Sequence, residues 1–146
     1  MIPVNVDKIS YHPSSRSYAV LLKEGNSEKV IPILVGSFEA QSIALALEVV
    51  ETPRPLTHDL FKAFGEAYNI TVQKIVIHTL IEGIFHASFH CKHNESNQES
   101  SIDARTSDAI ALAIRYKCPI FTYEDRQGRV RDGFSVANGP QDRSRR

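Results

Sequence analysis

The spacing of apolar residues along the chain separates strands from helices. Apolar residues that alternate with polar ones, or run without interruption, predict strands at about residues 4–11, 18–22, 30–35, 72–80, 84–91 and 120–123, and a further strand that ends at Ile102. Apolar residues three or four positions apart predict helices that begin near Ser37, Thr57 and Thr106. Three strands followed by a helix, twice over, indicate an α+β fold.

The same pattern contains an internal repeat. Ile43-Ala44-Leu45-Ala46-Leu47 recurs 67 positions later as Ile110-Ala111-Leu112-Ala113-Ile114, and Lys8-Ile9 recurs 66 positions later as Lys74-Ile75. At the offset of 67, the alternating residues of two strands also match: Tyr18, Val20 and Leu22 with Phe85, Ala87 and Phe89.

The repeat predicts the architecture. We expect duplicated β-β-β-α units, at about residues 4–50 and 72–117, that share one core. The core would be a largely antiparallel or mixed sheet with the helices packed on it. The helix at about 58–69 would be an addition to the first unit.

The helix predicted after Thr106 is apolar over most of its circumference, because Ala111 and Leu112 lie outside the face formed by Ala109, Ile110, Ala113 and Ile114. We therefore expect it to be buried on more than one side. Leu45 and Leu112 both lie off the main faces of their helices, so we predict a homo-oligomer, most simply a twofold dimer, that covers them.

Composition narrows the class of protein. The chain has 146 residues, which suit one domain at about residues 1–125, followed at 126–146 by a hairpin and an arginine-rich flexible tail. The net charge of zero gives no bulk attraction for nucleic acid. Two cysteines without a CxxC motif, no apolar run of about 18 residues and no signal-like N-terminus predict a cytoplasmic protein without a membrane segment.

Polar residues gather at the N-terminal ends of the predicted helices, where free N–H groups and the helix dipole favour a phosphate. The residues assigned to binding of phosphate or nucleic acid are Arg54, Thr57, Arg105 and Ser107. The candidate catalytic residues are Glu39, His58, Asp59, Asp103 and Asp108. They could act as general acids or bases, or around a divalent cation such as Mg²⁺ or Mn²⁺.

An ordinary structural role accounts for each of these residues as well. Ser37, Thr57 and Thr106 suit helix N-caps, and the carboxylates complement the helix dipoles. Asp103 and Asp108 bracket one strand-to-helix turn, where they repel each other unless Arg105 or a cation lies between them. The evenly spaced His78, His86 and His90 indicate one face of a sheet, and no spacing in the chain proves a metal site.

Four motifs together resemble the bifunctional nuclease family, formerly a domain of unknown function. They are IPILVGSFEA at 31–40, RPLTHDL at 54–60, EGIFHA at 82–87 and DARTSDAIALA at 103–113. The resemblance covers about residues 4–124. The chain departs from the family pattern at Thr106, where proline is usual, and at His86, where tyrosine is frequent.

The resemblance implies a DNase and RNase that hydrolyses phosphodiester bonds. In such an enzyme Arg54 and Arg105 would stabilise charge at phosphorus, and the carboxylates, with a metal ion, would activate water. Two alternatives stay open. One is a non-catalytic regulatory module that binds a phosphate-bearing ligand or a protein in the same groove, and the other is a hydrolase of smaller phosphoesters.

Overall fold

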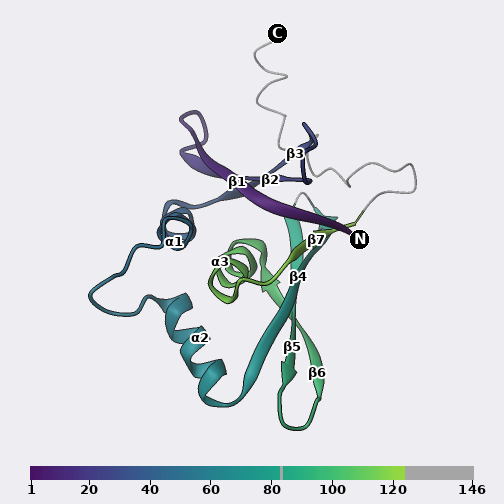
Figure 1. Cartoon of the computed structure of the whole chain (residues 1–146). Coiled ribbons are helices and arrows are strands. Elements are labelled where there is room, and N and C mark those ends of the chain that lie inside the picture. The colour runs from purple at the N-terminus through teal and green to yellow at the C-terminus, as the bar shows by residue number, and fades with distance from the viewer. Residues whose placement is uncertain (83, 124–146) are drawn as a thin grey trace.

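The computed structural model describes residues 1–82 and 84–123, which form seven strands and three helices (Figure 1). The α+β fold predicted from the sequence is confirmed. In chain order the elements are β1 (Ile2–His12), β2 (Ser17–Lys23), β3 (Val30–Val35), α1 (Ser37–Leu47), α2 (Thr57–Ala67), β4 (Ile70–Ile81), β5 (Ile84–His93), β6 (Glu99–Arg105), α3 (Thr106–Tyr116) and β7 (Ile120–Thr122). The hairpin and tail predicted at 126–146 lie outside the described residues.

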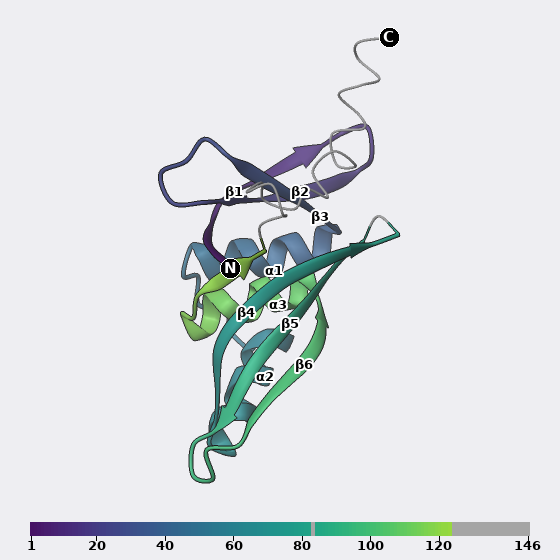
Figure 2. The same ribbon diagram turned by 90° about the vertical axis from the view of Figure 1, so that its right-hand side faces the viewer.

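All seven strands belong to one mixed sheet in the order β3-β2-β1-β7-β4-β5-β6. Neighbouring strands are antiparallel except β4 and β7, which are parallel. The sheet has two arms, β1–β3 and β4–β6, joined by the short β7 (Figure 1). In Figure 2 the β4–β6 arm lies in front of the helices. Helices α1 and α3 pack against each other in the angle between the two arms.

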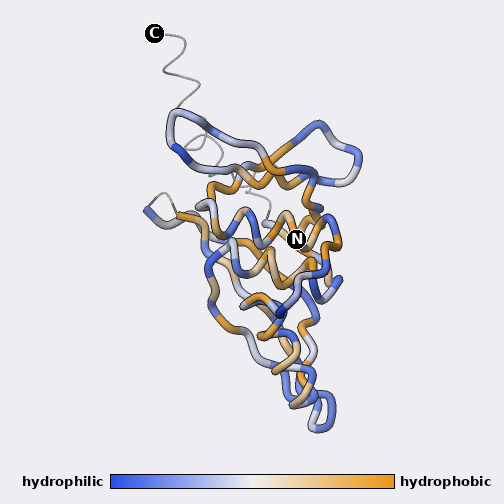
Figure 3. The backbone as a smooth tube through the Cα atoms, turned by 90° about the vertical axis from the view of Figure 1, so that its left-hand side faces the viewer, coloured by the Kyte–Doolittle hydropathy of each residue, from blue (hydrophilic) through white to orange (hydrophobic). Residues whose placement is uncertain are grey.

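Helix α3 occupies the centre of the molecule. It contacts α1, α2 and the strands β3, β4, β5 and β6. Ala109, Ile110 and Ala111 are fully buried, and Leu112 and Ala113 are 3% and 1% exposed. The predicted burial of this helix on more than one side is therefore confirmed. Figure 3 shows the same arrangement, with apolar positions where helices and sheet face each other and polar positions at the ends of the hairpins.

Leu112 is covered within the chain, so it gives no reason for a partner copy. Large apolar side chains are exposed on α2 instead. The sequence indicated an apolar face there, but Leu60, Phe64 and Tyr68 are 62%, 63% and 61% exposed. The contacts that do hold α2 include Phe61, whose ring meets the edge of Phe89 at 5.7 Å between centroids.

Gly65 is the one buried residue of α2. A Cβ atom at this position would lie 2.8 Å from the hydroxyl oxygen of Tyr116, so glycine allows α2 to approach α3 closely. Glycine in the interior of a helix costs about 1 kcal/mol of stability relative to alanine. The close packing of α2 on α3 explains why a glycine stands here.

The three helices begin at the residues predicted as their caps, but these residues occupy the first helical position. The N-cap is the preceding residue in each case, namely Gly36, Leu56 and Arg105, and none of the three forms a side-chain cap hydrogen bond. Thr106 instead donates its hydroxyl to the carbonyl oxygen of Phe85 at 3.1 Å. Its side chain therefore fastens α3 to β5, which a local sequence pattern does not reveal.

The two arms have the same order of elements, a three-stranded antiparallel meander followed by a helix of 11 residues. Strand pairing gives their correspondence directly. Val20 pairs with Ile9 and Ile33, and Phe89 pairs with Ile75 and Ile102. Val20 thus corresponds to Phe89, 69 positions later, whereas β1 and β4 correspond at 66, with register shifts between Val6 and Lys8 and between Val72 and Lys74.

The predicted offset of 67 is therefore two residues short for the second strand and for the helix, and the third strands, related through Ile33 and Ile102, also correspond at 69. In a strand, the alternation of apolar and polar residues repeats every two positions, so two strands also match when they are aligned two residues out of register. A helix made of Ile, Ala and Leu matches nearly as well after the same shift. The sequence comparison therefore aligned the two halves two residues away from the correspondence in the structure. The corrected offset places Glu39 of α1 and Asp108 of α3 at the same helical position, the third. Descent of the two halves from a duplication stays a prediction.

No helix among the described residues is long and apolar enough to span a membrane.

Truncation of Ile110 tests the central role of α3. Ile110 is fully buried, so Ile110→Ala should lower the free energy of unfolding by about 2–5 kcal/mol, through lost apolar burial and the cavity left behind. The measurement is urea unfolding followed by circular dichroism. Ile102→Ala, at a strand position that is 44% exposed, is the control and should cost much less. Equal losses for the two variants would contradict the assignment of α3 as the core element.

Candidate functional site

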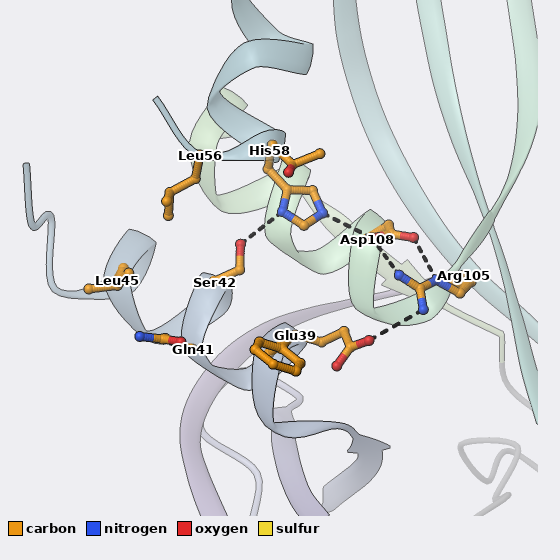
Figure 4. A pocket seen from close by; sticks show the side chains of 10 residues that line it. Glu39, Gln41, Ser42, Leu45, Leu56, His58, Arg105 and Asp108 are labelled. Carbon is orange, nitrogen blue, oxygen red and sulfur yellow. Dashed lines mark hydrogen bonds and ion pairs between the residues drawn. The ribbon is translucent and has the colours of Figure 1, made fainter. Parts of the chain in front are cut away.

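A pocket of about 400 Å³ opens between α1 and the N-terminal ends of α2 and α3 (Figure 4). It is lined by Phe38, Glu39, Gln41, Ser42, Leu45, Leu56, Thr57, His58, Arg105 and Asp108. The three helices contribute to it because α3 packs against both α1 and α2. Residues that are far apart in the sequence therefore meet at one place.

Arg105 lies between two carboxylates of this pocket. Its Nε donates to Asp108 Oδ2 at 2.8 Å, and its Nη2 donates to Asp108 Oδ1 at 3.3 Å. Its Nη1 donates to Glu39 Oε1 at 3.3 Å. The Arg105 side chain is 67% exposed, so its charge is accessible from solvent. Of the five guanidinium N–H groups, these three bonds leave two without a partner in the pocket.

The backbone at Gly36 makes room for the Glu39 side chain. A Cβ atom at Gly36 would lie 2.5 Å from Glu39 Oε2, so the lack of a side chain lets this carboxylate fold back beside the start of α1. Gly36 is the N-cap of α1 and Arg105 is the N-cap of α3. At corresponding positions, one half thus has Arg105, and the other has a glycine that leaves space for Glu39, the second carboxylate bound by Arg105.

His58 connects all three helices through its two ring nitrogens (Figure 4). Nε2 lies 2.9 Å from Asp108 Oδ1, and Nδ1 lies 2.8 Å from the hydroxyl oxygen of Ser42. The His58 side chain is 16% exposed and the Asp108 side chain is 31% exposed. The imidazole is therefore held at both edges, on the wall of the pocket.

The hydrogen bonds assign the protons of this group. An ionised carboxylate can only accept, so His58 Nε2 carries the proton and donates it to Asp108. In the neutral imidazole, Nδ1 then has a lone pair that accepts the Ser42 hydroxyl proton. The order carboxylate, imidazole, hydroxyl is the arrangement in which a histidine acts as a general base.

Electrostatics favour the ionised form of Asp108. Partial burial on its own would raise the pKa of this carboxyl group, but hydrogen bonds from Arg105 and His58 outweigh burial and lower the pKa below its ordinary value. The hydrogen bond from Arg115 likewise lowers the pKa of Asp59. Both groups are therefore carboxylates at neutral pH.

Arg115 supports the pocket from behind. Its side chain is 7% exposed, and its Nε donates to Asp59 Oδ1 at 2.7 Å. Its Nη2 donates to the carbonyl oxygen of Ser42 at 3.2 Å and to the Ser42 hydroxyl oxygen at 3.3 Å, and its Nη1 donates to Ala111 O at 3.0 Å. Asp59 also accepts the Leu56 N–H at 2.9 Å. One buried cation thus joins α1, α2 and α3.

The structure brings together five of the nine predicted site residues around the pocket: Glu39, Thr57, His58, Arg105 and Asp108. Asp59 faces Arg115 rather than the pocket. Arg54, Asp103 and Ser107 do not line it; Arg54 and Asp103 are exposed elsewhere, and Ser107 is 8% exposed. The functional roles of all nine residues stay predictions.

The carboxylate that shares Arg105 with Asp108 is Glu39, and not Asp103 as the sequence suggested. Asp103 lies two residues before Arg105 in the extended strand β6, and its side chain has no hydrogen bond or ion pair with another described residue. Extended backbone separates such neighbours by about 7 Å, whereas packing of α1 against α3 brings Glu39 within reach.

The described residues contain no group of three or more His, Cys, Asp or Glu placed to hold a metal ion. In the pocket the guanidinium of Arg105 stands between the two carboxylates and supplies the positive charge there. Mg²⁺ prefers six oxygen ligands, so these residues do not form a complete site for it. The divalent cation expected from the sequence stays a prediction.

Three residues of the site have no signal in the sequence that would have singled them out: Phe38, Ser42 and Arg115. Ser42 and Arg115 belong to helices that contain several other polar residues, so their polarity alone does not mark them. Phe38 is 84% exposed at the edge of the pocket, a position that its apolar side chain does not indicate.

Comparison with known proteins identifies the family. Residues 20–126 match the bifunctional nuclease domain. The chain belongs to the bifunctional nuclease domain family. The match includes every residue that lines the pocket, since these lie between Phe38 and Asp108. The resemblance noted from the four sequence motifs is thereby confirmed.

Proteins similar to this chain occur in Mycobacterium tuberculosis and in rice. An uncharacterized protein of Mycobacterium tuberculosis (strain H37Rv) is 38% identical over 105 residues, which are 72% of this chain and 61% of that protein. Bifunctional nuclease 1 of Oryza sativa subsp. japonica is 28% identical over 109 residues, 73% of this chain and 33% of its own length. The chain therefore matches less than two thirds of the length of these relatives.

The pH dependence of the stability lost in Asp108→Asn tests the charge on Asp108. Because its pKa is lowered on folding, the stabilisation is complete above the unfolded value of about 3.9 and is lost as the pH falls through the folded pKa. Asp108→Asn should therefore be less stable than the wild type by about 1–3 kcal/mol at pH 7, through weaker bonds to Arg105 and His58. The difference should shrink below about pH 4.

The measurement is urea unfolding between pH 7 and pH 2.5. Asp103→Asn is the matched control, since that side chain makes no hydrogen bond among the described residues, and it should follow the wild type throughout. A stability difference for Asp108→Asn that is the same at pH 3 and pH 7 would show that the charge on Asp108 does not stabilise the fold.

Proposed function

We propose that this protein hydrolyses phosphodiester bonds of nucleic acid, RNA or DNA, in the pocket between the three helices. The observation that carries the proposal is the position of His58 on the pocket wall, where Asp108 holds its Nε2 and the Ser42 hydroxyl contacts its Nδ1. Membership of the bifunctional nuclease domain family, and the similarity to the bifunctional nucleases of rice, support a nuclease.

The groups of the pocket suit the two requirements of phosphodiester hydrolysis. Arg105 has two N–H groups to offer to the phosphate oxygens, where negative charge accumulates in the transition state. His58 can take the proton of the attacking group at Nδ1, because Asp108 fixes the tautomer and stabilises the imidazolium that forms. Asp108 and Glu39 in turn hold Arg105 over the pocket.

Phe38 provides a surface for a base. Its ring is 84% exposed at the edge of the pocket that Arg105 and Glu39 also line, although exposure of an aromatic ring is unfavourable without a partner. Unpaired bases stack on such rings in proteins that bind single strands. This feature favours a nucleic-acid substrate over a smaller phosphoester.

A second candidate is a non-catalytic module that binds a phosphate-bearing ligand in the same pocket. The observation that favours it is the exposed guanidinium of Arg105, whose two remaining N–H groups can bind a phosphate without any catalytic step. Assays of hydrolysis and of binding separate the two candidates, since the module would bind a labelled oligonucleotide and leave it intact.

We also propose a homo-oligomeric state and a cytoplasmic location. The homo-oligomer rests on the exposed apolar side chains of α2 rather than on Leu112, and sedimentation showing a species of 16.4 kDa at micromolar concentration would contradict it. The cytoplasmic location rests on the sequence features alone.

Substitution of the two central groups tests the proposed activity. His58→Asn and Arg105→Gln should each reduce hydrolysis of labelled single-stranded RNA and DNA by tenfold or more, since each removes at least about 1.4 kcal/mol of transition-state stabilisation. His12→Asn and Arg16→Gln, in the β1–β2 hairpin and outside the set of residues that line the pocket, are matched controls. Parallel reactions with Mg²⁺, Mn²⁺ or a chelator test the cation. Full hydrolysis by both variants would show that the pocket is not the active site.

Phe38→Ala tests the substrate class. Loss of one stacking platform costs about 1–3 kcal/mol, so the affinity for a fluorescent single-stranded oligonucleotide should fall by roughly fivefold to 150-fold. Phe64→Ala removes a ring that is 63% exposed on α2, outside the pocket, and should bind as the wild type does. Unchanged affinity for Phe38→Ala would remove this support for a nucleic-acid substrate.

A further inference from the structure

We propose that Ser42 is the nucleophile of this protein and forms a covalent seryl phosphodiester during hydrolysis. The inference rests on the proposed function in one respect only, that the substrate is a phosphodiester. It assigns a catalytic role to a residue on the middle of α1, 16 positions before His58 in the sequence and in hydrogen-bond contact with it.

The geometry supplies the base. The Ser42 hydroxyl oxygen lies 2.8 Å from His58 Nδ1, and His58 Nε2 lies 2.9 Å from Asp108 Oδ1. Asp108 accepts the proton of Nε2, so Nδ1 is free to accept the hydroxyl proton of Ser42. A serine whose proton is accepted by a carboxylate-oriented histidine is activated for attack.

Arg115 acts on the same oxygen. Its Nη2 donates to Ser42 Oγ at 3.3 Å, from a guanidinium that is 7% exposed. A buried positive charge beside Oγ stabilises the negative charge that develops on this oxygen as its proton leaves. The hydroxyl thus donates to His58 and accepts from Arg115, which leaves one lone pair of Oγ for attack.

The position of Ser42 suits attack on a bound phosphate. Ser42 and Arg105 line the same pocket, and Ser42 is only partly buried. The Ser42 carbonyl accepts a second bond from Arg115 at 3.2 Å, so backbone and side chain are both fixed. Figure 4 shows the Ser42 hydroxyl directed at the imidazole and Arg105 on the far side of Asp108.

The reaction balances in two steps. In the first, Ser42 Oγ forms a bond to phosphorus, its proton passes to His58 Nδ1, and the bond from phosphorus to the leaving oxygen breaks while that oxygen takes the proton from His58. In the second, water attacks phosphorus and gives a proton to His58 Nδ1, the Oγ–P bond breaks, and Ser42 recovers the proton. One water is consumed and no other reactant is required.

The first test is covalent labelling of the wild-type chain with diisopropyl fluorophosphate, which transfers its phosphoryl group to activated serines with loss of fluoride. Mass spectrometry of the digested protein should find the added diisopropylphosphoryl group on Ser42. Ser37→Ala, an exposed serine on the same helix, should label like the wild type, and His58→Asn should lose most of the label. An unlabelled Ser42 in a chain that hydrolyses RNA or DNA would overturn the proposal.

The second test is the hydrolysis rate of Ser42→Ala on labelled single-stranded RNA and DNA, with the melting temperature measured beside it. A loss of 100-fold or more in a variant that melts as a folded protein is the expected result. Full hydrolysis by Ser42→Ala would overturn the nucleophile and leave the nuclease function intact. A labelled Ser42 in a wild-type chain that hydrolyses neither nucleic acid would support the nucleophile and overturn the nuclease function.

Discussion

The guanidinium of Arg115 is the contact on which the pocket depends most. It is almost completely buried, and it reaches α1 at Ser42 and α2 at Asp59 from its own helix, α3. Apolar packing holds α2 only weakly, because its large side chains are exposed and Gly65 is its one buried residue. Hydrogen bonds to charged groups, each worth about 1.5–3 kcal/mol, therefore contribute a large share of the force that positions α2 and with it His58.

The likeness of the two halves explains where the charges lie. Glu39 and Asp108 are both the third residue of their helices, at the positive ends of the two helix dipoles. Because α1 and α3 pack side by side, the two carboxylates come near each other and would repel. Arg105, at the N-cap of α3, lies between them, and the corresponding position in the other half is Gly36, which leaves space. The two halves are alike in placing a carboxylate at the third helical position, and they differ at the N-cap, where only α3 has an arginine. The positive charge of this arginine offsets the repulsion between the two carboxylates.

The polar groups of the pocket form one continuous chain from a buried cation to an exposed one. It runs from Arg115 through Ser42, His58 and Asp108 to Arg105, and each step is a hydrogen bond. The exposed fraction of the side chain is 7% at Arg115, 16% at His58, 31% at Asp108 and 67% at Arg105. A phosphate can therefore meet Arg105 from solvent, while hydrogen bonds hold the Ser42 hydroxyl and the His58 imidazole in place on the pocket wall.

Local periodicity and motifs of consecutive residues were enough to predict the strands, the helices, the α+β class, the burial of α3 and the family. The sequence also indicated His58, Arg105, Asp108 and Glu39, since charged residues at helix starts are visible in any reading of the chain. It did not pair Glu39 with Arg105, 66 positions away, or find Ser42 and Arg115. Those contacts exist only because three helices converge, and contact across packed helices depends on tertiary geometry that sequence spacing does not encode.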